Sequence, residues 1–356
     1  ITGDQKMDIL QHTFGRYQNE KVTEITLVND NGVEVSCLTM GAIWHRFAVP
    51  EDDGTKKNLL LSFDGIDGYY SNNQNICKSI GRVAGRIKGA SYDLNGKHYQ
   101  LPANENGNTL HGGPNGFSTL NWNYSTSISK NGISVIFQRK IDEEMDGFPG
   151  NILATIIYTL NNNNRVTIAY SAMNGKEDTL FNPTCHAYFN LSDRRDLTTH
   201  EMQINSTGIL DVDDQMIPTG EVVPVANTPY DFRDFSNVAL AVGKVHGLDT
   251  AYVVNGPGQG TKPVAVLRDR ESGRQITVNS DRNGLVVYTP EEIADQNMSF
   301  SRDHGEPANK NEGIALECQM LPDAIHQDNF GDIVLPRYSK QTYRFSFTYD
   351  RIKNED

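Results

Sequence analysis

The sequence predicts an all-β protein built as a large antiparallel β-sandwich. Apolar and polar residues alternate over many short segments, turn signals separate these segments, and few stretches show helical periodicity. No linker rich in proline and serine divides the 356 residues, and no repeat of fixed period is present. Because large sandwiches often exceed the usual domain size, we expect residues 1–356 to form one domain.

The first half of the chain contains two clear hairpin signals. Residues 22–28 alternate as a strand, the turn-forming segment 29–32 follows, and residues 33–38 are expected to pair back. A second hairpin is expected over 91–101, with Asn95-Gly96 as its turn, because that dipeptide favours the tight turn of a two-residue loop.

Further strands are expected along the rest of the chain. Residues 153–160 and 165–172 flank four asparagines and are predicted to form a hairpin. Single strands are predicted at three places before the last one, which closes the chain: 133–138, 276–278, 284–289 and 342–349. The glycine-rich segment 256–260 is short enough to be a surface turn.

Composition and charge narrow the class of partner. The chain has 32 Lys and Arg against 45 Asp and Glu, a formal net charge of −13 and a pI near 5.1. Nucleic acids and anionic membranes are bound through clustered basic residues, so neither is expected as a partner. The charge alone does not identify a substrate.

Cysteine usage and hydropathy indicate the compartment. The four cysteines lie far apart and form no CxxC pair, so neither a zinc site nor a disulfide framework is predicted: Cys37, Cys77, Cys185 and Cys318. No run of about 18 apolar residues exists, and residues 1–6 lack a signal-peptide core. We therefore expect a reduced, cytoplasmic protein, either a monomer or a homodimer.

The segment 182–191, NPTCHAYFNL, is the most informative of the chain. It places His186 among aromatic and apolar residues, where an imidazole is oriented and partly desolvated. Because successive strand residues face opposite sides, only one of Tyr188 and Phe189 can face the same site as His186. For the same reason, Cys185 and His186 are a poor candidate for a nucleophilic pair.

A carboxylate stands in an apolar strand near the C-terminus, in the segment 313–324. Burying Glu317 is costly unless it is paired or used, and burial raises a carboxyl pKa into the range of a useful base. Gln319, two residues on, is expected on the same face and could support Glu317.

Three other segments carry candidate polar groups. Residues 81–87, GRVAGRI, contain Arg86, whose guanidinium can donate several hydrogen bonds to hydroxyl groups. The spacing matches no phosphate-binding loop. Residues 108–113, NTLHGG, place two glycines after His111, where they permit tight turns. Residues 247–252, GLDTAY, contain Asp249. Taken singly, each of these residues is as well explained by a structural role.

Together, these segments resemble the aldose 1-epimerase (galactose mutarotase) family, over most of the chain and in the order His111, His186, Asp249, Glu317. The resemblance implies a galactose mutarotase-like supersandwich and a free aldohexose, such as galactose or glucose, as substrate. It assigns His186 as the acid at the ring oxygen and Glu317 as the base at the anomeric hydroxyl. The sugar is then expected to be held by the residues Arg86, His111, Asp249, Tyr188 and Gln319. No metal or other cofactor is implied.

The chain departs from the family pattern at three places. Gly85 replaces the usual asparagine, Cys185 stands where many relatives have a polar asparagine, and Thr250-Ala251 replaces His-Asn. Four alternatives therefore stay open: a mutarotase preferring maltose, one preferring a hexose 6-phosphate, a glycoside hydrolase using Asp249 and Glu317, and a catalytically silent sugar-binding protein.

Overall fold

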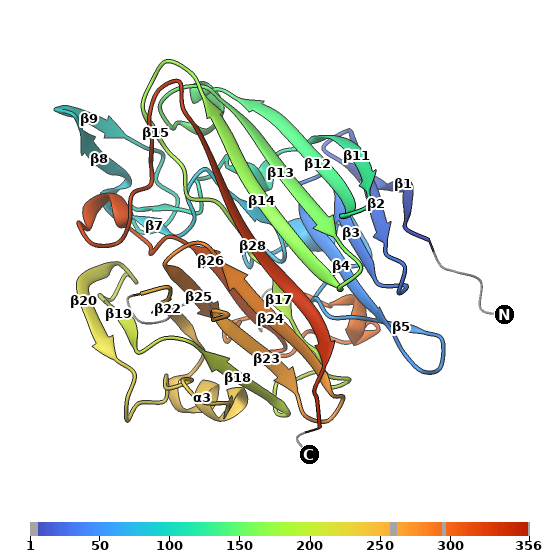
Figure 1. Ribbon diagram of the computed structural model, residues 1–356. Coiled ribbons are helices and arrows are strands. Elements are labelled where there is room, and N and C mark those ends of the chain that lie inside the picture. The colour runs from blue at the N-terminus through green and yellow to red at the C-terminus, as the bar shows by residue number, and fades with distance from the viewer. Residues whose placement is uncertain (1–5, 257–261, 294–296, 355–356) are drawn as a thin grey trace.

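The computed structural model describes residues 6–256, 262–293 and 297–354. Most of the predicted surface turn at 256–260 and the start of the chain lie outside these ranges. Antiparallel sheets dominate, which confirms the predicted fold class (Figure 1). The described α-helices are short: α1 (Ile66–Tyr70), α2 (Glu143–Asp146) and α3 (Val238–Val245). None of the described helices is long and apolar enough to span a bilayer.

The largest sheet has nine strands. In spatial order these are β11 (Asn123–Ser129), β12 (Gly132–Ile141), β13 (Ile152–Leu160), β14 (Arg165–Asn174), β28 (Lys340–Arg351), β24 (Arg274–Ser280), β23 (Ala265–Asp269), β18 (His200–Ile204) and β21 (Ser236–Asn237). The last strand of the chain, β28, therefore lies in the middle of this sheet, between β14 and β24 (Figure 1). The predicted hairpin of β13 and β14 is confirmed, with Leu160 opposite Val166.

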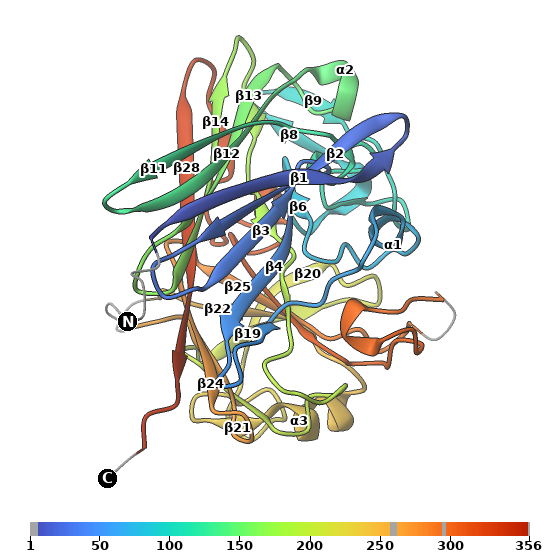
Figure 2. The same cartoon turned by 90° about the vertical axis from the view of Figure 1, so that its right-hand side faces the viewer.

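Two further sheets complete the sandwich. The N-terminal sheet contains β1 (Asp8–Tyr17), β2 (Glu20–Val28), β3 (Glu34–Leu38), β4 (Ile43–Pro50) and β5 (Lys56–Asn58), and it is turned toward the viewer in Figure 2. The other has six strands, in the order β17 (Tyr188–Phe189), β26 (Ile314–Gln319), β25 (Gly284–Tyr288), β22 (Asp249–Val253), β19 (Gly208–Val212) and β20 (Pro218–Pro224). Pairing of β2 with β3 confirms the first predicted hairpin.

Short two-stranded pairings connect these sheets. They are β6 (Ser79–Ile80) with β16 (Thr184–Cys185), β7 (Arg86–Ile87) with β10 (Thr109–Leu110), β8 (Ser91–Leu94) with β9 (Lys97–Gln100), and β15 (Thr179–Leu180) with β27 (Val334–Leu335). The β8–β9 pair is the hairpin that Asn95-Gly96 predicted. Four 3₁₀ turns are also present: η1 (Lys88–Ala90), η2 (Phe117–Thr119), η3 (Ser301–Asp303) and η4 (Ala324–His326).

Aromatic side chains join the sheets in a shared core. The ring of Trp44 on β4 lies 5.3 Å from that of Phe347 on β28, measured between centroids. Phe189 on β17 lies 5.1 Å from the same Phe347 ring. One aromatic residue of the large sheet thus contacts both smaller sheets, and burial of these rings accounts for much of the packing between layers.

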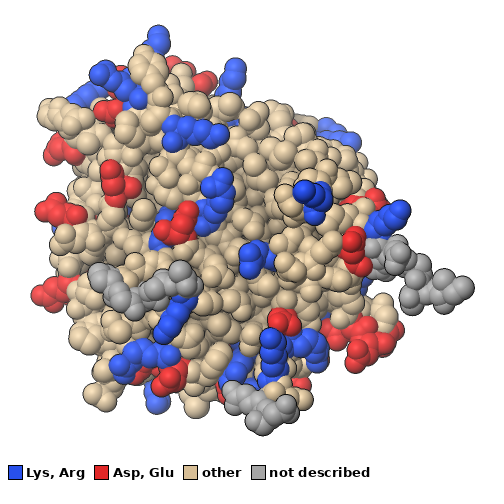
Figure 3. All heavy atoms as spheres, in the orientation of Figure 1, with Lys and Arg blue, Asp and Glu red and all other residues tan. Residues whose placement is uncertain are grey.

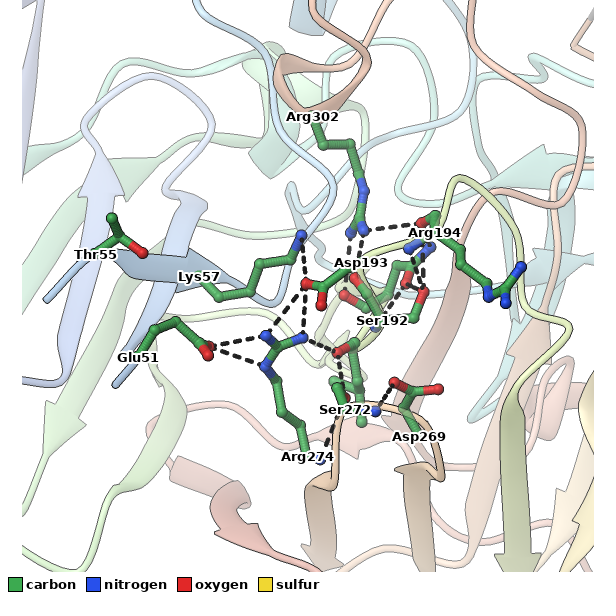
Figure 4. A network of polar contacts seen from close by, with 12 residues as sticks. Glu51, Thr55, Lys57, Ser192, Asp193, Arg194, Asp269, Ser272, Arg274 and Arg302 are labelled. Carbon is green, nitrogen blue, oxygen red and sulfur yellow. Dashed lines mark hydrogen bonds and ion pairs between the residues drawn. The ribbon is translucent and has the colours of Figure 1, made fainter. Parts of the chain in front are cut away.

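A polar network on the surface fixes the loop after β17 to the large sheet (Figure 4). Arg274 on β24 contacts Glu51 at 2.9 Å and Asp193 at 3.2 Å, and it donates to the carbonyl of Leu191 at 2.7 Å. Lys57 contacts the same Asp193 at 3.5 Å. Because every cation here has a protein partner, the network is structural.

Acidic and basic side chains are mixed on the face drawn in Figure 3. Each sign is interspersed with the other, so this face presents no broad basic patch of the kind that nucleic acids require.

Candidate active site

A cavity of about 240 Å³ collects the residues singled out in the sequence. It lies on the six-stranded sheet and is closed on one side by β7, β10 and the loops around them. All seven predicted site residues line it: Arg86, His111, His186, Tyr188, Asp249, Glu317 and Gln319. Strands β17, β26 and β22 supply Tyr188, Glu317 and Asp249 from positions far apart in the chain.

His186 is held as the sequence predicted, buried between aromatic rings. Its ring stacks on Tyr188 at 5.0 Å and meets Tyr288 edge-on at 6.1 Å. Its backbone is fixed on both sides, with the N–H donating to the carbonyl of Lys78 and the carbonyl accepting from Cys77. Alternation places Tyr188 on the cavity side and turns Phe189 into the core, as expected.

Cys185 points away from the cavity. Its sulfur lies in the core, 3.8 Å from the hydroxyl of Tyr158, and it is buried as a free thiol. Burial raises the pKa of this thiol well above its usual value. A buried, protonated thiol is a poor nucleophile, so the alternative of a Cys185–His186 pair is excluded.

Glu317 lies opposite His186, with the carboxylate Oε1 and the imidazole Nε2 separated by 3.5 Å. Burial raises the pKa of Glu317 well above its usual value, and the neighbouring charge of Asp249 adds to this. Burial also lowers the pKa of His186, to about 3. The sequence suggested an imidazole titrating near neutrality; in the unliganded cavity desolvation overrides that expectation and favours the neutral form of both groups.

His111 is locked by its own loop. The backbone N–H of Gly85 donates to Nδ1 of His111 at 3.0 Å, and the His111 N–H donates to the carbonyl of Gly85 at 3.0 Å. Since Nδ1 accepts a proton from the backbone, the neutral ring carries its own proton on Nε2 and can donate it. Gly112, with φ +84°, is required here because a Cβ would lie 2.0 Å from the carbonyl oxygen of Gly81.

Arg86 reaches the cavity from β7, where it pairs with Leu110 on β10. Its guanidinium is held by Glu105, through Nε to Oε1 at 2.5 Å and Nη2 to Oε2 at 3.3 Å. The sequence analysis missed Glu105, which lines the same cavity. No local pattern marks this residue, because the pairing of β7 with β10 is what brings it to Arg86.

Asp249 begins β22, directly opposite Tyr288 on β25. Its side chain is open to solvent at the rim of the cavity, yet the surrounding protein still desolvates the carboxyl and raises its pKa, against the opposing charge of Arg86. Tyr288 was also missed; its hydroxyl donates to Oε1 of Gln74 at 2.8 Å. Gln74 in turn accepts, through its carbonyl, the Tyr188 hydroxyl at 2.6 Å.

Gln319 does not support Glu317 as expected. It is 1% exposed, lines the cavity on the same face as Glu317, and neither of its amide atoms has a protein partner. Residues two apart on a strand are separated by about 6.8 Å, and their parallel side chains do not reach each other.

Three groups of the cavity are of a type that can bind a metal ion. One ligand atom each from His111, His186 and Glu317 lie within 4.8 Å of one another. A cation bound there would occupy the atoms that proton transfer requires.

Comparison with known proteins agrees with the geometry of the cavity. The chain matches the profile of the aldose 1-epimerase family over residues 23–349. It is 45% identical to the aldose 1-epimerase of Streptococcus thermophilus, over 96% of this chain and 99% of that one. It is 37% identical to the maltose epimerase of Levilactobacillus brevis, over 97% and 100%. The crystal structure of a galactose 1-epimerase from Lactobacillus acidophilus superposes with a TM-score of 0.84 at 26% identity, covering 98% of this chain and all of that one. The chain therefore belongs to the aldose 1-epimerase family.

Proposed function

We propose that this enzyme interconverts the α and β anomers of free aldohexoses by opening and reclosing the sugar ring. The observation that carries the proposal is the buried pair of His186 and Glu317, 3.5 Å apart in a cavity of about 240 Å³. A base and an acid at opposite ends of the O1–C1–O5 unit are sufficient for the reaction.

In the proposed mechanism Glu317 takes the proton of O1 while His186 gives a proton to O5. The C1–O5 bond breaks and leaves an open-chain aldehyde with a hydroxyl at C5. Rotation about C1–C2 presents the other face of the carbonyl. The reverse transfers then close the ring as the other anomer, and both residues regain their starting protonation states.

The protonation of the empty cavity is compatible with this cycle. Burial favours a protonated Glu317 and a neutral His186. That neutral pair holds the same number of protons as a carboxylate beside an imidazolium. Shifting one proton across 3.5 Å therefore generates the base and acid that a ring-closed sugar needs.

Arg86, His111 and Asp249 are proposed to position the sugar, with Tyr188 as a wall behind His186. The guanidinium and the Nε2–H of His111 supply donors, and the carboxylate of Asp249 supplies acceptors for hydroxyl groups. Holding the sugar in this orientation contributes to rate because the reacting atoms start close to the acid and the base.

Polarimetry tests the proposal directly. Freshly dissolved α-D-galactose and α-D-glucose should reach their usual final rotations faster with catalytic amounts of the enzyme. The rate should survive dialysis against EDTA, since we expect no metal. Binding without acceleration would instead support the silent sugar-binding alternative, and release of phenol from an aryl glycoside would support the hydrolase.

A reducing disaccharide is a second candidate substrate, favoured by a specific cavity. A hollow of about 510 Å³ adjoins the first and shares its wall at Val212, Met216, Asp249 and Ala251. It opens where β19 and β22 diverge, since these strands pair only at Ile209 and Tyr252. Faster turnover of maltose than of glucose would favour this substrate. A hexose 6-phosphate is less well suited, because Arg86 is the only Lys or Arg among the described lining residues and is already paired with Glu105.

A further inference from the structure

We propose that Gln319 is a specificity-determining residue whose amide binds the hydroxyl at C2 of the sugar. The inference rests on the proposed function, which places O1 at Glu317 and O5 at His186. It departs from the expectation that Gln319 supports the catalytic glutamate.

The first argument is the state of the amide in the empty cavity. Gln319 is 1% exposed, and both Nε2 and Oε1 lack a hydrogen-bond partner. Buried amides are almost always paired, because an unpaired one loses its hydration without compensation. An amide that lines a cavity and is unpaired there is suited to a ligand that supplies both a donor and an acceptor. A sugar hydroxyl supplies both.

The second argument is the contrast with the other glutamine of the cavity. Gln74 also lines it, but its Oε1 accepts from Tyr288 and its Nε2 donates to Asn73. Its amide is used to orient protein groups. Gln319 therefore differs in having its polar atoms free, although both residues belong to the same wall.

The third argument is the room in front of the amide. Gly85 has φ +75°, and a Cβ built there would lie 3.4 Å from Nε2 of Gln319 and 3.0 Å from Cβ of Pro322. The absence of a side chain at position 85 thus keeps the approach to Gln319 open. The departure of Gly85 from the family pattern and the free amide of Gln319 are in contact with the same space.

The fourth argument identifies the hydroxyl. Glu317 and Gln319 project from one face of β26, about 6.8 Å apart along the strand. When Glu317 holds O1 and His186 holds O5, the ring hydroxyl nearest to O1 is O2, on the other side of C1 from O5. Hydrogen bonds from each residue, added to the separation of O1 and O2, span the distance between the two side chains.

The test compares glucose with 2-deoxyglucose in three proteins. We would measure kcat/KM by polarimetry for the wild type, Gln319→Met and the matched control Gln74→Met. Methionine has similar volume and no amide. We expect the wild type to prefer glucose by about 10- to 100-fold, as for a buried group left unpaired. The preference should fall below about threefold in Gln319→Met and persist in Gln74→Met, even if that variant is slower on both sugars.

The outcomes separate this inference from the proposed function. An unchanged preference in Gln319→Met, or equal losses on both sugars, would overturn the role of Gln319 while leaving epimerisation intact. If the wild type does not epimerise glucose, the proposed function fails. Dissociation constants from titration calorimetry with the same two sugars and three proteins would then decide the role of Gln319 by the same ratio.

Discussion

Two buried polar clusters lie within one segment of this chain and differ in how they are satisfied. Arg82 is fully buried and donates five hydrogen bonds, two of them to Asp146, at 2.7 and 3.1 Å. Four residues later Arg86 reaches the cavity, where buried atoms of His186, Glu317 and Gln319 have no hydrogen-bond partner. Both clusters are costly to bury, but only the first is compensated within the protein.

The difference separates architecture from chemistry. A saturated cluster such as Arg82 with Asp146 has no donor left for a ligand, so its contribution is to hold the loop of α2 against β6. An unsaturated cluster lowers the stability of the empty protein, and a ligand that pairs its atoms recovers that free energy on binding. Substitutions in the two clusters should therefore have opposite effects on activity and on stability.

The largest expected effect is loss of turnover in the unsaturated cluster. Glu317→Gln and His186→Asn should each lower kcat by about 10²- to 10⁴-fold, because each removes one proton-transfer group. Thermal unfolding monitored by circular dichroism should show no loss of stability. A variant that keeps near-normal turnover would remove that residue from its assigned role.

The next effect concerns stability and comes from the saturated cluster. Arg82→Met leaves the Asp146 carboxylate buried without its partner, which typically costs about 3–5 kcal/mol of unfolding free energy. Urea denaturation would measure the loss. At low temperature the folded fraction should retain its turnover. A loss of kcat as large as in Glu317→Gln, with unchanged stability, would contradict the division into two clusters.

A smaller effect is expected where the two kinds of residue meet, at Glu105. Its carboxylate orients the Arg86 guanidinium but is not proposed to transfer a proton. Glu105→Gln should raise KM about tenfold and change kcat little, since a charge-assisted hydrogen bond is worth roughly 1.5–3 kcal/mol. Steady-state kinetics on glucose would show this. An effect confined to kcat would instead place Glu105 in the chemistry.

The sequence predicted the strands well where alternation is strong. The burial of β13 alternates along its whole length, and the segment 153–160 was recognised from that pattern. β1 was missed because it is an edge strand, with most of its residues exposed or half-buried and little alternation. The short strands that carry the cavity, such as β7 and β10, have two residues each and leave no periodic signal.

The residues of the cavity could be named from the sequence only through the family resemblance. Tyr188 pairs with Ala315 across β17 and β26, and this long-range register brings His186 to Glu317. Propensity and periodicity are local properties and cannot predict such a register. The partners Glu105 and Gln74 were missed for the same reason, since nothing near them in the chain marks the groups that they contact.

The smallest effect is a pH-dependent difference in stability between the wild type and Glu317→Gln. Burial raises the pKa of Glu317 in the folded protein above its value of about 4.5 in the unfolded chain. The folded state then binds the proton more tightly. Stability from this group is fully present below pH 4.5 and is lost as the pH rises toward the folded pKa.

Glutamine does not titrate, so the variant should escape this loss. The difference in unfolding free energy between variant and wild type should be small at pH 4.5 and grow by on the order of 1 kcal/mol by pH 6. Parallel urea denaturation at both pH values would measure it, and all other titrating groups cancel in the comparison. If the two proteins lost or kept stability together, the Glu317 carboxyl would have to be paired when folded, and it would belong with Arg82 and Asp146 instead of with the site.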